Sequence, residues 1–523
     1  MDTKALRQKI LDLAIRGKLV PQDPNDEPAS VLLERIREQK KQMVKDGKLK
    51  PKDIKKDTVI FKGDDNLHYE KFPDGSVKCI EDEIPFNLPE GWAWCRLNSI
   101  ATFELGKTLD TAKNTGTYKP YLRSVNVRWN SIDLNDINCM KFEPDELTRY
   151  SIKKGDLLIC EGGDVGRSCV WEKDEEMYYQ NALHRVRFYM NINPYFYMYI
   201  MMYYANSGKL QEICKGVTIK HLTRTTLLTL LFPLPPQNES LNIINKISKF
   251  DSLLRKLEEN KNNISYLISC TKSKILDLAI RGKLVPQNSN DEPASMLLER
   301  IRAEKEELIK QGKIKRNKKE SVIFKGDDNS YYEKVDNEVR CIDTEIPYDL
   351  PDGWIWCRLG NIGEWQTGAT PSRKKTEYYN GTMPWIKTGD LNNGYIKVVP
   401  ESITELAITN TSVKIIPENT VIIAMYGATI GKVGITTSTA TTNQACCACC
   451  NPKMVREKYL FYFLMSYKNA FVSIAEGGAQ PNISKEKITA TLIPFPSIAE
   501  QIRIYTAIDN AFSVLDYIEK LLN

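Results

Sequence analysis

The sequence predicts an α/β (α+β) protein that is built twice, with two globular domains separated by two long antiparallel coiled-coil helices. Three observations lead to this prediction. The segment KILDLAIRGKLVPQ at Lys9–Gln22 returns unchanged at Lys274–Gln287, which identifies an internal repeat. Each half holds short β-branched and aromatic runs separated by glycine, asparagine and proline, as is typical of mixed α/β domains. Apolar residues then recur at alternating steps of four and three, as in coiled coils. We therefore expect a pseudo-twofold molecule.

The repeat continues along both halves in the same order. Four further markers occur twice: DEPAS at Asp26 and Asp291, LLERIR at Leu32 and Leu297, VIFKGDDN at Val59 and Val322, and EIPFNLPEGWAWCRL at Glu83 with EIPYDLPDGWIWCRL at Glu345. Beyond these markers the copies diverge but can still be aligned. PYLRSVN at 120–126 matches PWIKTGD at 384–390, and LLICEGGDVGR at 157–167 matches IIAMYGATIGK at 422–432 with a one-residue gap.

These markers divide the chain into helical and globular segments. They are an N-terminal helical region at 1–47, a basic linker or insert at 48–90, a first globular domain at 91–238, a central helical region at 239–312, a second linker or insert at 313–352, a second globular domain at 353–498, and a C-terminal helix at 499–523. A chain of 523 residues is long enough for several such units.

The predicted coiled-coil seam lies partly in the central helix and partly at the chain ends. Its members are Ile243, Ile247, Phe250, Leu254, Leu257, Ile264 and Ile268 in the centre, and Ile504, Ile508, Leu515 and Ile518 near the C-terminus. The C-terminal run repeats the first half of the central helix, and the N-terminal region repeats its second half. The two chain ends together are therefore expected to form one equivalent of the central helix. A helix of about 40 residues would span roughly 60 Å.

Composition places the protein among soluble, multi-domain proteins of the cytoplasm. The net charge of +6 is only mildly basic. The N-terminal residues are charged every few positions, so they do not form a secretory signal. The apolar stretch at 194–205 is too short to cross a bilayer. Cysteines without an export signal imply reduced thiols.

No catalytic site is predicted in this chain. Gly106-Lys107-Thr108 lacks the earlier glycine of a phosphate-binding loop. Asn193-Pro194-Tyr195 lacks the second proline of the motif with which adenine methyltransferases hold their target, and no glycine-rich cofactor loop precedes it. The cysteines at 446–450 have no second pair or histidines at zinc-ligand spacing, so a buried strand is the favoured interpretation. We expect neither a metal nor a cofactor on this chain.

Nucleic-acid binding is better supported by the charge pattern. Residues 35–56 and 300–319 are both rich in lysine and arginine. Each run ends a helix that is predicted to begin after Pro28 or Pro293 and to break near Gly47 or Gly312. A solvated helix face explains any single lysine equally well. The same basic arm in both copies would suit a duplex bound through its phosphates.

The alternation of two diverged domains with two near-identical helical regions resembles the specificity subunit of type I restriction–modification systems. The resemblance covers essentially the whole chain and includes the duplicated KILDLAIRGKLVPQ, the paired LPEGWAWCRL and LPDGWIWCRL, and TGATPSR at Thr367. It implies a non-catalytic subunit whose two target recognition domains each read one half of a two-part DNA site. It also implies that the helices set the spacing and dock two adenine methyltransferase subunits. Restriction and translocase subunits would complete the complex, and AdoMet, ATP and Mg²⁺ would be bound only by partners.

The duplication suggests which residues read bases. Positions identical in both copies, such as Trp92/Trp354 and Trp94/Trp356, should be structural anchors, because the two domains read different sequences. Polar loop residues that differ between copies are the candidate readers, since Arg, Lys, Asn and Gln match purine edges. In the first domain these are Lys107, Arg123, Asn126, Arg128, Arg167, Lys220 and His221. In the second they are Ser372, Arg373, Lys374, Lys387, Asp390, Asn392, Tyr426, Lys432, Gln480 and Asn482.

The sequence is also compatible with two other functions. A coiled-coil scaffold without sequence readout would share the helices but bind all duplexes equally, with loss of binding in moderate salt. A nuclease would need clustered carboxylates with a nearby lysine, and no such spacing is present in the sequence.

Overall fold

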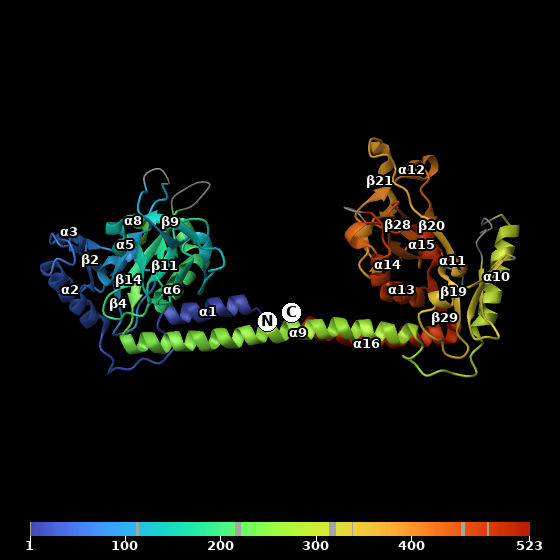
Figure 1. Cartoon of the computed structure of the whole chain (residues 1–523), viewed down its shortest axis with the longest axis horizontal. Coiled ribbons are helices and arrows are strands. Elements are labelled where there is room, and N and C mark those ends of the chain that lie inside the picture. The colour runs from blue at the N-terminus through green and yellow to red at the C-terminus, as the bar shows by residue number, and fades with distance from the viewer. Residues whose placement is uncertain are drawn as a thin grey trace. The chain divides into compact units, whose positions relative to one another are not determined.

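A computed structural model describes residues 2–110, 114–214, 221–312, 321–336, 338–450, 456–477 and 481–522. The chain divides into two compact units, Met1–Asn260 and Lys261–Asn523, and Figure 1 labels many of their elements. Each unit contains both helices and sheets, in agreement with the predicted α+β class. Helix α9 (Gln237–Ile280) contributes residues to both units.

The first unit contains helices α1–α8 and strands β1–β15. Its helices are α1 (Thr3–Ile15), α2 (Ala29–Lys45), α3 (Pro51–Ile54), α4 (Leu97–Ile100), α5 (Leu147–Tyr150), α6 (Pro194–Asn206), α7 (Lys209–Ile213) and α8 (Arg224–Thr229). Its strands are β1 (Val59–Lys62), β2 (His68–Lys71), β3 (Val77–Cys79), β4 (Ala93–Arg96), β5 (Ala101–Leu105), β6 (Thr117–Leu122), β7 (Val127–Arg128), β8 (Ser131–Ile132), β9 (Asn138–Phe142), β10 (Ser151–Ile152), β11 (Leu157–Cys160), β12 (Ser168–Val170), β13 (Met177–Tyr179), β14 (Leu183–Phe188) and β15 (Leu231–Leu234).

The second unit contains helices α10–α16 and strands β16–β29. Its helices are α10 (Ala294–Lys310), α11 (Leu359–Ile362), α12 (Glu405–Asn410), α13 (Glu457–Ser466), α14 (Lys468–Ser473), α15 (Lys485–Ala490) and α16 (Ile498–Leu522). Its strands are β16 (Ser321–Lys325), β17 (Tyr331–Val335), β18 (Glu338–Cys341), β19 (Ile355–Arg358), β20 (Glu364–Thr367), β21 (Tyr379–Ile386), β22 (Gly394–Ile396), β23 (Ser402–Ile403), β24 (Ile415–Ile416), β25 (Val421–Ala424), β26 (Val433–Thr436), β27 (Ala440–Thr442), β28 (Cys446–Cys450) and β29 (Leu492–Phe495).

The strand orders repeat from one unit to the other. A main sheet of order β12-β11-β14-β5 in the first unit corresponds to β26-β25-β28-β20 in the second, where β22 is added at the edge. A further sheet, β10-β13-β6-β9, corresponds to β24-β27-β21-β23. The pairs β13·β6 and β27·β21 are parallel, whereas most other pairs are antiparallel. Divergence of the two sequences has therefore left the strand topology largely unchanged.

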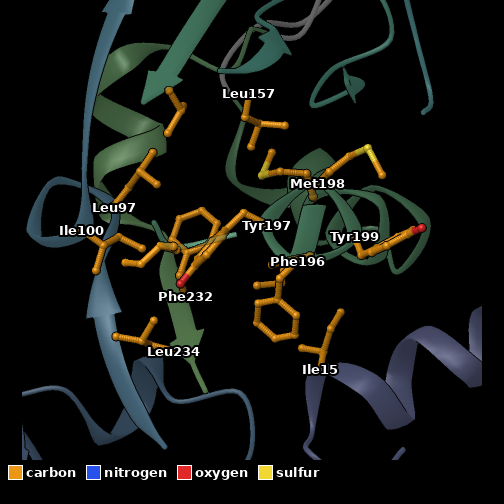
Figure 2. Close-up of a cluster of buried hydrophobic side chains, with 14 of the residues drawn as sticks. Ile15, Leu97, Ile100, Leu157, Phe196, Tyr197, Met198, Tyr199, Phe232 and Leu234 are labelled. Atoms are coloured by element: carbon orange, nitrogen blue, oxygen red, sulfur yellow. The ribbon is translucent and has the colours of Figure 1, made fainter. Parts of the chain in front are cut away.

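The core of the first unit joins these sheets to helices from distant parts of the sequence. Figure 2 shows Phe196 and Tyr197 of α6 among Leu157, Phe232 and other apolar side chains from neighbouring strands and helices, with Ile15 of α1 close to Phe196. Helix α6 begins at Pro194, whose missing N–H costs nothing in the first turn, and the Asn193 side chain accepts a bond from the Tyr195 N–H at 3.0 Å. The Asn-Pro-Tyr motif is therefore a helix cap.

The cysteine-rich segment forms a buried strand, as predicted. Cys446, Cys447 and Cys449 of β28 are fully buried, and burial raises the pKa of the Cys447 thiol to about 12. Such thiols remain protonated and behave as small apolar side chains. Among the described residues there is no group of three metal-ligating side chains.

The terminal helices pack against α9 within their own units (Figure 1). In the first unit, the Arg7 guanidinium of α1 bonds Asp251 at 3.1 Å and Glu258 at 2.8 Å. Asn238 near the start of α9 bonds Asp26, which follows α1, so the two helices run antiparallel. In the second unit, Lys272 bonds Asp516 of α16 at 2.6 Å.

The predicted seam is only partly buried. Ile243, Ile247, Leu254 and Ile268 of α9 are buried, as are Ile504 and Ile508 of α16, while Phe250 and Leu515 are half-buried. The prediction is wrong for three members: Leu257, Ile264 and Ile518 are 39%, 38% and 39% exposed. In the first unit α9 pairs with α1, which begins at Thr3, and in the second unit α9 pairs with α16, which ends at Leu522. The three exposed residues lie near these helix ends, where each pair of helices ends.

The four repeated tryptophans are buried anchors, as predicted. The Trp92 indole N–H donates to the Glu239 carboxylate of α9 at 2.8 Å, and Trp354 makes the equivalent bond to Glu500 of α16 at 2.9 Å. Burial raises the pKa of both glutamates, against the effect of the bond from each indole. The paired bonds attach each globular domain to the start of a long helix.

Replacing Trp92 with Phe should lower the free energy of unfolding of the first unit by about 1–3 kcal/mol beyond the cost of the smaller ring, because the buried Glu239 carboxylate loses its indole donor. The matched control is Trp94→Phe, since the Trp94 indole N–H has no hydrogen-bond partner among the described residues. Chemical denaturation of the two variants measures the difference. Equal losses in both variants would contradict a specific contribution from the Trp92–Glu239 bond.

Candidate nucleic-acid interface

Each domain carries a loop after an equivalent strand of its main sheet, β11 in the first domain and β25 in the second, and the two loops have the same backbone hydrogen bonds. In the first domain, the loop 161–167 is closed by bonds from Cys160 N to Arg167 O at 2.8 Å and from Gly166 N to Cys160 O at 3.0 Å. In the second, Ala424 N bonds Lys432 O at 2.9 Å and Gly431 N bonds Ala424 O at 3.0 Å. Arg167 and Lys432 therefore occupy equivalent positions.

A second segment crosses this loop in both domains. Leu222 N donates to Glu161 O at 2.7 Å in the first domain, and Ile483 N donates to Met425 O at 2.9 Å in the second. The preceding residues, His221 and Asn482, are therefore equivalent, and both are exposed. Asn482 forms a bridge with Tyr426. A Cβ on Gly162 would lie 3.3 Å from the His221 ring, so a larger residue at position 162 would crowd this ring.

A third matched feature is a capped 3-10 turn after β6 and after β21. The Asn126 amide oxygen accepts from Arg123 N at 2.9 Å, and the Asp390 carboxylate accepts from Lys387 N at 2.8 Å. Arg123 and Lys387 are therefore equivalent as well. The Arg167 guanidinium donates to Ser124 O at 2.9 Å, which places the first-domain loop beside this turn.

In the first domain the structure gathers several predicted readers around the loop 161–167. Arg123 bonds Asp136, and Arg167 bonds Asp164 at 3.3 Å. Arg128, on strand β7, is exposed. Strand β7 contacts β11 and β12, which flank the loop. Arg123 and Arg167 are half-buried and each is paired with an aspartate, so Arg128 is the most open of the three arginines.

Two first-domain predictions are contradicted by burial. Lys107 is 4% exposed, and its ammonium is paired with Glu146 and lies over the Phe142 ring. Asn126 is 2% exposed, and its side-chain NH2 group donates to the backbone oxygens of Asp133 and Asp136. Because both side chains are enclosed and bonded, neither is available to a base. Lys220 lies outside the described residues.

In the second domain the predicted readers fall into two neighbouring groups. Arg373 bonds Glu401 at 2.7 Å and lies over the rings of Tyr379 and Trp385, while Lys387 is paired with the same glutamate. Ser372 and Lys374 are exposed beside Arg373. The other group contains exposed Tyr426, Asn392 and Asn482 and half-buried Lys432. Asp390 is half-buried and caps the turn, so its carboxylate positions Lys387. Gln480 lies outside the described residues.

The carboxylates that hold these cations were not predicted from the sequence. Glu401 contacts both Arg373 and Lys387, and hydrogen bonds from Lys387 and Arg373 lower its pKa. A negatively charged partner would have to compete with Glu401 for both cations. The spacing of Glu401 from either residue in the sequence gives no signal of this pairing.

None of the described helices is both long and apolar enough to cross a bilayer.

Asn126→Ala should lower the free energy of unfolding of the first unit by about 1–3 kcal/mol, since it removes a turn cap and leaves backbone groups unpaired. Asn135→Ala is the matched control, because the Asn135 side chain is exposed nearby. Thermal denaturation distinguishes the two. An unchanged Asn126→Ala variant would return Asn126 to the candidate readers.

Comparison with known proteins gives matches along the chain. The family described as "Type I restriction modification DNA specificity domain" matches residues 89–265 and 351–523. The type I restriction enzyme EcoEI specificity subunit of Escherichia coli is 26% identical over 99% of this chain and 90% of its own length. The EcoAI specificity subunit of the same species is also 26% identical, with the same coverage.

Solved structures agree at the level of the fold. A chain from a structure titled for complex assembly and conformational transition of the type I R-M system has a TM-score of 0.56 at 15% identity, covering 84% of this chain and 94% of its own. The HsdS subunit from Thermoanaerobacter tengcongensis has a TM-score of 0.50 at 16% identity, covering 84% and 93%.

Proposed function

The chain belongs to the family of type I restriction–modification DNA specificity domains, and on that premise we propose that it is the subunit that selects the DNA sequence in such a complex. It has no catalytic role of its own in this proposal. Each globular domain acts as a target recognition domain and reads one half of a two-part duplex site.

The observation that carries this proposal is the pair of equivalent surfaces with different side chains. The backbone hydrogen bonds around the loops 161–167 and 425–432 are the same in the two domains. The side chains at equivalent positions differ, however: His221 in the first domain corresponds to Asn482 in the second, and Arg167 corresponds to Lys432. Arginine and lysine can donate to guanine O6 and N7, and asparagine can bind the adenine edge. One framework that carries different side chains at equivalent positions, such as His221 and Asn482, is what two unlike half-sites require.

The helices supply the remaining parts of the proposal. Helix α9 and helix α16 set the unspecified spacing between the half-sites and dock two adenine methyltransferase subunits. Exposed apolar residues on both helices support docking: Leu253 and Leu267 on α9, and Val514 and Leu521 on α16. Restriction and translocase subunits join the same assembly. AdoMet, ATP and Mg²⁺ are bound by these partners.

The proposal is tested by co-expressing the chain with its methyltransferase subunit and sequencing the modified adenines of the host DNA by a single-molecule method. A two-part motif with a fixed unspecified gap is the expected result. A complex that co-purifies but modifies no defined sequence would contradict sequence selection and favour a coiled-coil scaffold.

Single substitutions at equivalent positions should each relax one half-site only. Arg167→Ala should weaken discrimination in the half read by the first domain, and Asn482→Ala in the half read by the second, each by about 1–3 kcal/mol if a base-edge bond is lost. Competition binding with duplexes altered in one half at a time measures both effects. Loss spread evenly over all sequences would assign the residue to phosphate contact instead.

A further inference from the structure

Each unit carries a small three-stranded sheet that precedes its globular domain. Strands β1, β2 and β3 form the first sheet and β16, β17 and β18 the second, both antiparallel and in sequence order. One face of each sheet is attached to the domain. Glu70 bonds the Arg96 guanidinium at 2.7 Å, and Glu333 bonds Arg358 at 2.8 Å. Both glutamates are buried.

The opposite face of each sheet is here called the outward face. Because side chains alternate across a strand, the register places Val59, Phe61, Tyr69, Lys71, Val77 and Cys79 on it in the first unit. The register of the second sheet places Val322, Phe324, Tyr332, Lys334, Val339 and Cys341 there. Every one of these residues is identical in the two copies.

The attached face is identical in part: Ile60, Lys62 and Glu70 correspond to Ile323, Lys325 and Glu333. On the attached face His68 corresponds to Tyr331, and Lys78 corresponds to Arg340. In the first turn Leu67 corresponds to Ser330. The attached face, which packs on the domain, has therefore changed at two of its matched positions. The outward face has not changed, although most of it is open.

The outward face is apolar, and its own unit leaves much of it exposed. Phe61 and Phe324 are 41% and 42% exposed, and Val77 and Val339 are 52% and 55% exposed. Each phenylalanine stacks on the tyrosine of the next strand, with ring centroids 5.9 Å apart in both copies. Exposed apolar groups of this kind contribute little to folding and mark binding surfaces.

The charges around the face favour a protein partner over a nucleic acid. The turns between strands carry exposed carboxylates at Asp64 and Asp65, and at Asp327 and Asp328. The Tyr69 hydroxyl donates to Asp65 at 2.6 Å, and Tyr332 donates to Asp328 at 2.9 Å. These carboxylates would repel phosphates, while the exposed ammonium of Lys71 or Lys334 can pair with a carboxylate of the partner.

We propose that the two outward faces, in addition to the helices, dock two copies of one protein partner, the methyltransferase subunit, through an apolar patch of that subunit that carries a carboxylate opposite Lys71 or Lys334. The assignment of this subunit rests on the proposed function, which requires one partner in two copies. A surface that has to bind the same protein twice cannot diverge between the copies, whereas surfaces that read two half-sites must.

The cysteines at the face provide a direct test. Cys79 and Cys341 are exposed on the outward faces, and Cys139 on β9 is an exposed control outside them. Purified chain is treated with N-ethylmaleimide alone, with the methyltransferase subunit, and with a duplex. Labelling of Cys79 and Cys341, read by mass spectrometry, should fall about tenfold in the methyltransferase complex, which corresponds to an occluded site, and Cys139 labelling should be unchanged.

Substitutions separate the two faces. Phe61→Ser and Phe324→Ser should each weaken binding of one methyltransferase copy by about thirtyfold, as expected for an aromatic anchor, and the double variant should weaken both. Tyr118→Ser is the matched control, because Tyr118 is 69% exposed and lies outside these sheets. Native mass spectrometry gives the number of bound copies.

Several results would overturn the proposal. A complex that modifies a two-part DNA motif while both cysteines keep full reactivity would reject docking at these faces and leave the proposed function standing. Protection by the duplex alone would assign the faces to nucleic acid. Protection that grows with the concentration of the chain alone would assign them to a second copy. Failure of any methyltransferase complex to form would reject both proposals.

Discussion

The bond from a buried indole to a buried carboxylate at the start of each long helix is the constraint on which the rest of the structure depends. Trp92 and Trp354 directly precede the first strands, β4 and β19, of the globular domains, and their bonds to Glu239 and Glu500 connect these strand ends to the long helices. A carboxylate in such a place is costly unless it is bonded. The bond therefore restricts how each domain can sit on its helix, and it is present in both copies.

This constraint leaves the loops free to vary. The strands of the two main sheets keep the same order, and the turns capped by Asn126 and Asp390 keep the same geometry. Side chains at the loop surface can then change without a change in backbone position. In the proposed function, the duplicated frame thus separates two requirements: identical attachment to helices and partners, and different contacts with each half of a DNA site.

The repeat, the strand-rich domains, the tryptophan anchors and the buried cysteine strand could be predicted from the sequence, because each depends on local pattern or on comparison of the copies. The burial of Lys107 could not, because it depends on Glu146, which spacing does not connect to it. The capping role of Asn126 left a usable signal, namely its position three residues after Arg123 and its match to Asp390. Apolar periodicity placed Leu257 and Ile518 in a seam, but periodicity does not show where a partner helix ends.

The central claim is that the two domains occupy interchangeable positions on one duplicated frame. The most direct test is a chain in which the second domain, residues 353–498, is replaced by a second copy of residues 91–238, followed by sequencing of the adenines modified by its methyltransferase complex. The account predicts a motif in which both halves carry the half-site of the first domain and the unspecified gap is unchanged. A folded, assembled variant that retains the original second half-site, or modifies no defined motif, would contradict it.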